Sequence, residues 1–122
     1  MHLNFPLFPL ARGSLGKEGL VKEYDIFVPL CFNDGSPVEA EKFQQLQEDL
    51  LDQFGGLTFF PQPNKGVWRM AGVTYRDEIV IYRVIGSATE KARPFLANLK
   101  ERLKADFDQE EILIVERDVE TL

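Results

Sequence analysis

Aromatic and cationic side chains gather in the middle of the sequence. Trp68 and Arg69 are adjacent, and Tyr75 and Arg76 follow after a glycine-containing connection. Aromatic faces beside arginine can line a pocket for an anionic or planar ligand. The surrounding segment, 58–86, carries four basic against two acidic residues in a chain whose net charge is −6. The alternative is that Trp68 is a core or interface anchor, as single tryptophans commonly are.

A second candidate site is the loop that precedes the first expected helix. Asn33 and Asp34 lie just before a helix N-terminus, where free N–H groups and the positive end of the dipole can hold an anion or carboxylate. The residues favour another interpretation, in which Ser36 and Glu39 form a capping box and the loop only turns the chain. The candidate ligand-binding residues from both sites are Asn33, Asp34, Trp68, Arg69, Tyr75 and Arg76.

The sequence offers few residues for metal or nucleophilic chemistry. Cys31 is the only cysteine and His2 the only histidine, so one chain cannot assemble a zinc or haem ligand set. We expect no metal and no cofactor. Cys31 near the helix dipole is a conceivable nucleophile, but no histidine is nearby to act as its base, and a free cysteine is usually a small buried residue. The catalytic residues and the role of Cys31 stay open.

Composition narrows the class of protein. The chain has 122 residues, enough for one domain, and we expect an apolar N-terminal arm over 1–20 and a single domain over 21–122. Twenty acidic against fourteen basic residues disfavour binding to nucleic acid. No apolar run approaches the roughly 18 residues of a membrane span. A lone cysteine suits a reducing compartment, so we expect the protein in the cytoplasm.

Hydrophobic spacing and turn residues predict six or seven elements. Helical spacing and capping signals predict one helix over 37–54 and another around 92–107, with Ser87 and Glu90 as a second capping box. Prolines after the second strand suit an edge of the sheet. The expected strands are 24–30, 57–60, 66–69, 75–85 and 111–117.

This β-α-β-β-α-β order, over residues 22–118, resembles the ferredoxin-like superfamily. The resemblance implies an α+β fold, a split βαβ with a four-stranded antiparallel sheet and two helices on one face. The polar, glycine-containing loop between the first strand and the first helix resembles that of amino-acid-sensing ACT domains. Its order, Asp34-Gly35-Ser36-Pro37, differs from the Asp-x-Pro-Gly of that family, so the family's ligand residues are not carried over to this chain. The topology is also that of dimeric α+β barrels. RNA-recognition domains are a poorer match, because residues 76–82 lack their basic–Gly–aromatic motif.

Two of the expected strands are apolar on both faces, although both helices should cover the same face. Ile79 and Ile81 should point to one face of the sheet and Val80 to the other. Leu113 should likewise point to the face opposite that of its two neighbours in the last strand. Something must cover the second face: a second copy of the chain, the arm residues 3–10, or nothing if the pattern is noise in short strands. We expect a homodimer through the helix-free sheet face, which Val80→Asp or Leu113→Asp should separate.

Three functions are compatible with this architecture. The first is a small self-associating binding or regulatory domain for a small anionic ligand. The second, which the barrel resemblance implies, is a cofactor-independent enzyme of the dimeric α+β barrel type. The third is a pure protein–protein interaction module. Whether the chain is an enzyme, and which ligand it binds, stays open at this point, because fold does not determine function.

Overall fold

The computed structural model describes residues 20–86 and 90–122. The expected apolar arm lies outside these ranges apart from its last residue, Leu20, at which the first strand begins. Three of the four residues of the second expected capping box, 87–89, also lie outside them. Within the described residues, no helix is long and apolar enough to cross a membrane.

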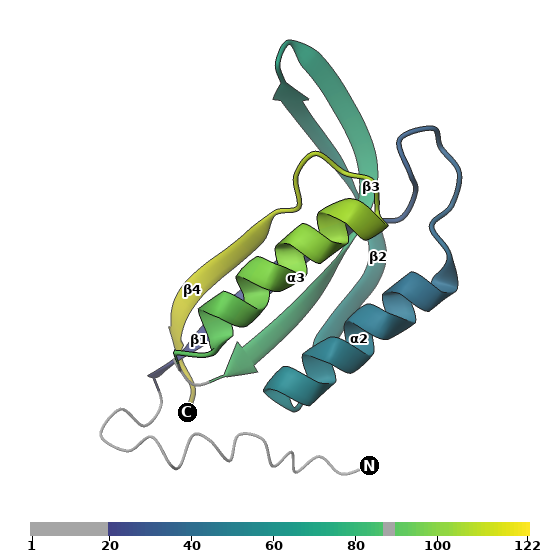
Figure 1. The fold of residues 1–122 in the computed structure, drawn as a ribbon. Coiled ribbons are helices and arrows are strands. Elements are labelled where there is room, and N and C mark those ends of the chain that lie inside the picture. Colours follow the sequence, from purple (N-terminus) through teal and green to yellow (C-terminus); the bar gives the residue numbers. More distant parts are fainter. Residues whose placement is uncertain (1–19, 87–89) are drawn as a thin grey trace.

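The chain folds into one four-stranded antiparallel sheet with two helices on the same face (Figure 1). The strand order is β2-β3-β1-β4, and each neighbouring pair is antiparallel. This confirms the predicted α+β, ferredoxin-like arrangement. In chain order the elements are β1 (Leu20–Pro29), α2 (Ala40–Phe54), β2 (Thr58–Met70), β3 (Val73–Gly86), α3 (Ala92–Asp106) and β4 (Ile114–Glu120).

The core lies between the sheet and the two helices, because alternate strand residues point towards α2 and α3. Ile26 of β1 pairs with Tyr82 of β3, and both are fully buried. Leu50 of α2 and Leu99 of α3 pack into the same cluster. Burial of one such side chain contributes about 2 kcal/mol to folding, so this helix-covered face supplies most of the stability.

The first helix begins later than the sequence predicts, at Ala40 rather than Pro37. The predicted capping box is wrong, because Ser36 makes a different contact. Its hydroxyl and its backbone N–H both donate to Oδ1 of Asp34, at 2.6 and 2.9 Å, which closes the preceding turn. The helix N-cap is Glu39, which makes no side-chain capping hydrogen bond.

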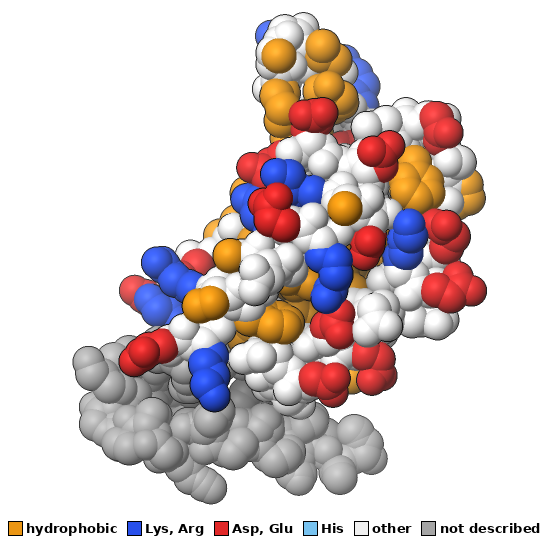
Figure 2. All heavy atoms as spheres, in the orientation of Figure 1, with side chains coloured by type: hydrophobic (Ala, Val, Ile, Leu, Met, Phe, Trp, Pro, Cys, Tyr) orange, Lys and Arg blue, Asp and Glu red, His pale blue; other side chains and the backbone are white. Residues whose placement is uncertain are grey.

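The two short strands expected over 57–60 and 66–69 are one long strand, β2. The pairing register shifts between Phe60 and Asn64, and this irregularity accommodates both prolines at the edge of the sheet, as predicted. β2 and β3 form a hairpin that projects beyond the rest of the sheet (Figure 1). Figure 2 shows apolar side chains at its projecting end with basic side chains beside them, and acidic and basic side chains interspersed over the helices.

The last strand is also displaced from its expected position. β4 covers Ile114–Glu120, not 111–117. The chain is nevertheless paired with β1 one residue before β4 begins, because the carbonyl of Leu113 accepts a hydrogen bond from the N–H of Phe27 at 3.0 Å. The residues before Leu113 belong to the connection from α3.

The opposite face of the sheet, which no helix of the described chain covers, is called here the helix-free face. Register places Phe27, Ile81 and Phe60 side by side on it across three strands, all partly exposed. Leu113, on the same face, is 50% exposed. Val80 faces the core and is 1% exposed, so the expectation that Val80→Asp would separate protomers is wrong: that charge would enter the core.

A closed group of charges lies beside these apolar residues on the helix-free face. Asp25 is 2% exposed and binds both Arg83 and Arg117, and Glu23 contacts the same two arginines. Two carboxylates and two guanidinium groups make this ion cluster electrically neutral. The Arg83 guanidinium also lies 5.0 Å from the centre of the Phe60 ring.

Candidate functional site

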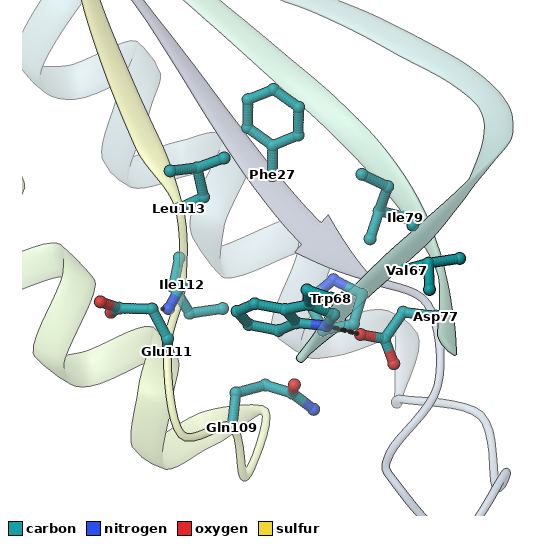
Figure 3. Close-up of a pocket in the computed structure, with 11 residues that line it drawn as sticks. Phe27, Val67, Trp68, Asp77, Ile79, Gln109, Glu111, Ile112 and Leu113 are labelled. Atoms are coloured by element: carbon teal, nitrogen blue, oxygen red, sulfur yellow. Dashed lines mark hydrogen bonds between the residues drawn. The ribbon is translucent and has the colours of Figure 1, made fainter. Parts of the chain in front are cut away.

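A pocket of about 280 Å³ opens on the helix-free face, where β1 ends and the projecting part of the hairpin begins (Figure 3). Its floor comes from β1 and β3, one wall from β2, and the other wall from the connection between α3 and β4. The lining residues are mostly apolar: Phe27, Pro29, Gly66, Val67, Trp68, Asp77, Ile79, Gln109, Glu111, Ile112 and Leu113.

Trp68 forms one wall of the pocket. Its indole extends from the hairpin towards Ile112 on the opposite wall (Figure 3). The indole Nε1–H donates a hydrogen bond to Oδ2 of Asp77 at 2.9 Å. Gly66 pairs with Asp77 in the ladder and Trp68 with Tyr75, so the hydrogen bond is a diagonal contact within the hairpin. It holds the ring at one angle and leaves its surface available to a ligand.

The opposite wall carries the remaining polar groups, Gln109 and Glu111. The amide of Gln109 donates to the carbonyl of Phe107 at 3.0 Å, which fixes the side chain at the end of α3. Partial burial opposes ionisation of Glu111, but hydrogen bonds from Lys100 and from the N–H of Ile112 outweigh it and hold the Glu111 pKa below its usual range. The pocket therefore has an ionised carboxylate on this wall at neutral pH.

Three of the residues predicted from the sequence come together in the structure. Asn33, Trp68 and Tyr75 line one small hollow of about 10 Å³ next to the larger pocket. Gln109 joins the two sites, because it lines both and its amide contacts Oδ1 of Asn33 at 3.4 Å. Asn33, from the loop candidate, thus lies beside Trp68 and Tyr75, from the hairpin candidate, and Trp68 lines both the small hollow and the larger pocket.

The other three predicted residues lie elsewhere. Arg69 and Arg76 are exposed and occupy the alternate strand positions, which point to the face of the hairpin opposite Trp68. Asp34 closes its own turn, and the hydrogen bonds from the Ser36 hydroxyl and N–H lower its pKa. Asp34, Arg69 and Arg76 do not line the pocket, and a ligand role for any of the six residues stays a prediction.

Cys31 is a free, partly exposed thiol that lies outside the pocket lining. Its backbone forms an isolated bridge with Pro37, in the loop that leads to α2. Among the residues that the structure describes, no three His, Cys, Asp or Glu side chains are grouped so as to hold a metal ion.

Several pocket residues were not among the candidates from sequence. Asp77 shares the strand face of Tyr75, two positions away, so strand alternation applied to the expected strand 75–85 indicates it. Gln109 and Glu111 have no such signal, because they lie in a connection whose path depends on how α3 packs. Leu113 was identified only as an apolar residue of the last expected strand, which has apolar side chains on both faces.

The largest pKa shifts belong to a pair of groups outside the pocket lining. Burial and the neighbouring Glu116 carboxylate raise the pKa of Tyr24 to about 12. The hydrogen bond from Arg93, assisted by one from Tyr24, lowers the pKa of Glu116 to about 2. Arg93 holds Glu116 through two hydrogen bonds of 3.0 and 2.7 Å, which links α3 to β4. These groups serve as a structural ion pair on the helix-covered side.

Comparisons with known proteins identify similar solved structures. A phage SAM lyase in complex with S-methyl-5′-thioadenosine is 18% identical, with a TM-score of 0.62 over 83% of each chain. A phage SAM lyase in the apo state is 20% identical, with a TM-score of 0.64 over 88% of this chain and 86% of the other. The divalent cation tolerance protein CutA1 from Thermus thermophilus is 18% identical, with a TM-score of 0.53 over 80% of this chain and 82% of the other.

At these identities the likeness establishes the fold alone. No protein-family model and no curated protein sequence matches the chain. The function must therefore be argued from the pocket and from the helix-free face.

Proposed function

We propose that the chain is a self-associating domain that binds a small molecule in the pocket beside Trp68. The observation that carries the proposal is the pocket itself: apolar walls from three strands and a connection, with a few polar groups placed among them. Ligand sites in proteins have this composition, with volumes of roughly 300–1,000 Å³. A volume of about 280 Å³ lies just below that range and suits a small ligand, about the size of one or two rings.

The similar structures support a small ligand as well. One of the phage SAM lyases is described in complex with S-methyl-5′-thioadenosine, so a domain of this fold accommodates a small nucleoside derivative. The indole of Trp68 offers a flat apolar surface of the kind on which aromatic rings stack. We therefore propose a ligand with a planar part, and S-methyl-5′-thioadenosine is a suitable first probe.

The helix-free face supports self-association. Phe27, Ile81 and Phe60 form a partly exposed apolar centre, and Leu113 extends it to the rim of the pocket. Monomeric proteins rarely leave contiguous apolar surface of this kind uncovered. The neighbouring ion cluster is already neutral, so a partner can cover it without burying unpaired charge. A second copy of the chain on this face, as a homodimer, remains our proposal for its cover.

Binding explains the pocket better than catalysis does. A catalytic pocket is expected to hold an acid or base whose pKa is strongly shifted towards the working pH. Tyr24 and Glu116 have the largest shifts, but both are shifted away from neutrality and neither lines the pocket. We accordingly propose a binding role, and the cytoplasm as its compartment because Cys31 is a free thiol.

Trp68 provides the test, because it is the only tryptophan in the sequence and its emission reports the pocket alone. Titration with a set of small planar compounds, S-methyl-5′-thioadenosine among them, should change that emission saturably and raise the melting temperature for at least one compound. Leu113→Ala should weaken that binding, whereas Leu51→Ala, an equally conservative change at an exposed position of α2, should not. Absence of any saturable change, with no small molecule retained in native mass spectrometry, would contradict the proposal.

A further inference from the structure

We infer that the pocket beside Trp68 selects a small organic cation with an apolar body. This inference rests on the proposed function and is opposite in sign to the anionic ligand that the sequence predicts. Both charged side chains of the lining, Asp77 and Glu111, are carboxylates. In the part of the chain that the structure describes, no lysine or arginine lines the pocket.

Strand geometry directs Arg69 and Arg76, on which the expected anion site depended, away from the pocket. Trp68 and Tyr75 pair in the ladder and share one face of the hairpin, so Arg69 and Arg76 fall on the other. The Nε–H of Arg69 donates to the Thr74 hydroxyl at 3.1 Å, which keeps it on that other face. An anion in the pocket would therefore meet two carboxylates and no cationic side chain.

The two carboxylates differ in how far their charge is compensated. Glu111 lies 3.2 Å from the ammonium group of Lys100, which offsets much of its field. Asp77 accepts one hydrogen bond, from the neutral indole of Trp68, and has no ion-pair partner among the described residues. A neutral donor leaves the full negative charge in place, so Asp77 is the principal attraction for a cation.

Trp68 reinforces the same preference. The face of an indole is its electron-rich surface and attracts a cation held within about 6 Å of the ring, most strongly when water is excluded. Apolar walls on both sides favour a ligand whose charge is attached to hydrocarbon rather than a hydrated metal ion. A single charge about 5 Å from Asp77 gains roughly fourfold in affinity even at the dielectric constant of water, and more in a partly enclosed pocket.

Three probes that share a benzyl group but differ in charge test the inference: benzyltrimethylammonium, N-benzylacetamide and phenylmethanesulfonate. Trp68 emission and the melting temperature should both report tightest binding for the cation, by about fourfold or more over the neutral probe. The anion should bind weakest. Increasing NaCl should reduce the cation's affinity and leave that of the neutral probe unchanged, because only the former is electrostatic.

Variants that remove one carboxylate charge at a time show which side chain attracts the cation. Asp77→Asn keeps an oxygen that can accept the Trp68 hydrogen bond, so the ring stays in place while the charge is lost. It should lower the affinity for benzyltrimethylammonium about fourfold and leave N-benzylacetamide binding unchanged. Glu111→Gln should have a smaller effect, because Lys100 already offsets that charge. Glu101→Gln, at an exposed position of α3, is the matched control and should change neither affinity.

The outcomes separate the inference from the proposed function. Equal or tighter binding of the sulfonate, or an equal effect of Asp77→Asn on all three probes, would overturn the cation preference and leave a small-molecule pocket standing. No response to any of the three probes would also overturn it. The pocket itself fails only if the wider set of planar compounds leaves Trp68 emission unchanged.

Discussion

Arg83 donates two parallel hydrogen bonds to Asp25, of 2.8 Å from Nε and 2.9 Å from Nη2, on the face of the sheet that the helices leave uncovered. The two residues are direct partners in the β1–β3 ladder, so neither side chain has to bend far to reach the other. Arg117 adds a third hydrogen bond to Asp25 at 3.0 Å. The pair shows how a carboxylate that is 2% exposed stays charged: guanidinium groups replace the water it has lost.

Removal of this charge should destabilise the protein. Asp25→Asn leaves Arg83 and Arg117 without their main counter-charge, and we expect a loss of about 2 kcal/mol or more in the free energy of unfolding. Urea unfolding followed by circular dichroism measures it. Asp118→Asn is the matched control, because Asp118 is exposed and pairs with Lys22 at the surface, where solvent screens the pair and the loss should be much smaller. Equal losses in the two variants would contradict the assignment.

Acid should destabilise the protein through carboxylates whose pKa is lowered by folding. The arginine hydrogen bonds lower the pKa of Asp25, and Arg93 lowers that of Glu116 from 4.5 to about 2. A lowered pKa means stability that is present above the unfolded value and lost as the pH falls towards the folded value. The urea midpoint should therefore decline below about pH 4.5.

Glu116→Gln should make that acid decline shallower between about pH 4.5 and 2, because the variant has no proton to take up at this position. The effect should diminish in high salt, since Arg93 is largely exposed. A midpoint that does not vary between pH 7 and pH 3 would contradict both carboxylate assignments.

Tyr24 should make stability depend on pH in the opposite direction under alkaline conditions, because folding raises its pKa from 10.0 to about 12. Its contribution to stability is present below pH 10 and lost as the pH rises towards 12.

The turn of the long hairpin offers a stabilising substitution. Ala71 and Gly72 have φ values of 50° and 81°, a left-handed conformation that suits glycine and asparagine and strains alanine. Ala71→Asn should raise the free energy of unfolding by about 0.5–1 kcal/mol, measured as a higher melting temperature. Ala97→Asn, at an exposed site within α3, should do the opposite, because asparagine is a poorer helix former than alanine.

Self-association should respond to a charge on the helix-free face. Leu113 is 50% exposed, so Leu113→Asp should leave the chain folded and shift the molar mass in solution from dimer to monomer. Size-exclusion chromatography with light scattering at micromolar concentration measures it. Leu51→Asp, at a position of α2 that is 42% exposed, should leave the mass unchanged. A wild-type chain that is itself monomeric would exclude the homodimer, and removal of residues 1–20 would then test the arm as the cover.

The order of helices and strands could be predicted from the sequence, because the turn residues and apolar spacings that set it are local. Gly55 ends α2 in a left-handed conformation, with its N–H bonded to the carbonyl of Leu51 at 2.8 Å, as the glycine pair in the sequence predicts. The alternation through Tyr24, Ile26 and Val28 likewise gave the buried face of β1. Such signals lie within a few residues of one another, so no tertiary contact is needed to interpret them.

Element ends were less predictable, because a side chain near an element end can bond to more than one partner. Ser36 has the right spacing for a capping box with Glu39, yet it bonds to Asp34, two residues before it. The start of β4 at Ile114 likewise depends on where the connection from α3 reaches the sheet edge. A small change of hydrogen-bond partner decides each of these boundaries.

The amino-acid sequence by itself determined the split βαβ topology, the core stripes of β1, α2 and α3, and the presence of apolar side chains on both faces of β3. It did not determine which face of β3 meets the helices, because both faces are apolar, and the structure places Val80 in the core. Only the tertiary structure decided which polar groups meet. It set Trp68 against Asp77, brought Asn33 next to the hairpin, and directed Arg69 and Arg76 away from the pocket. The physical reason is that a ligand site joins residues distant in the chain, and their meeting depends on strand register, twist and the path of connections rather than on local spacing.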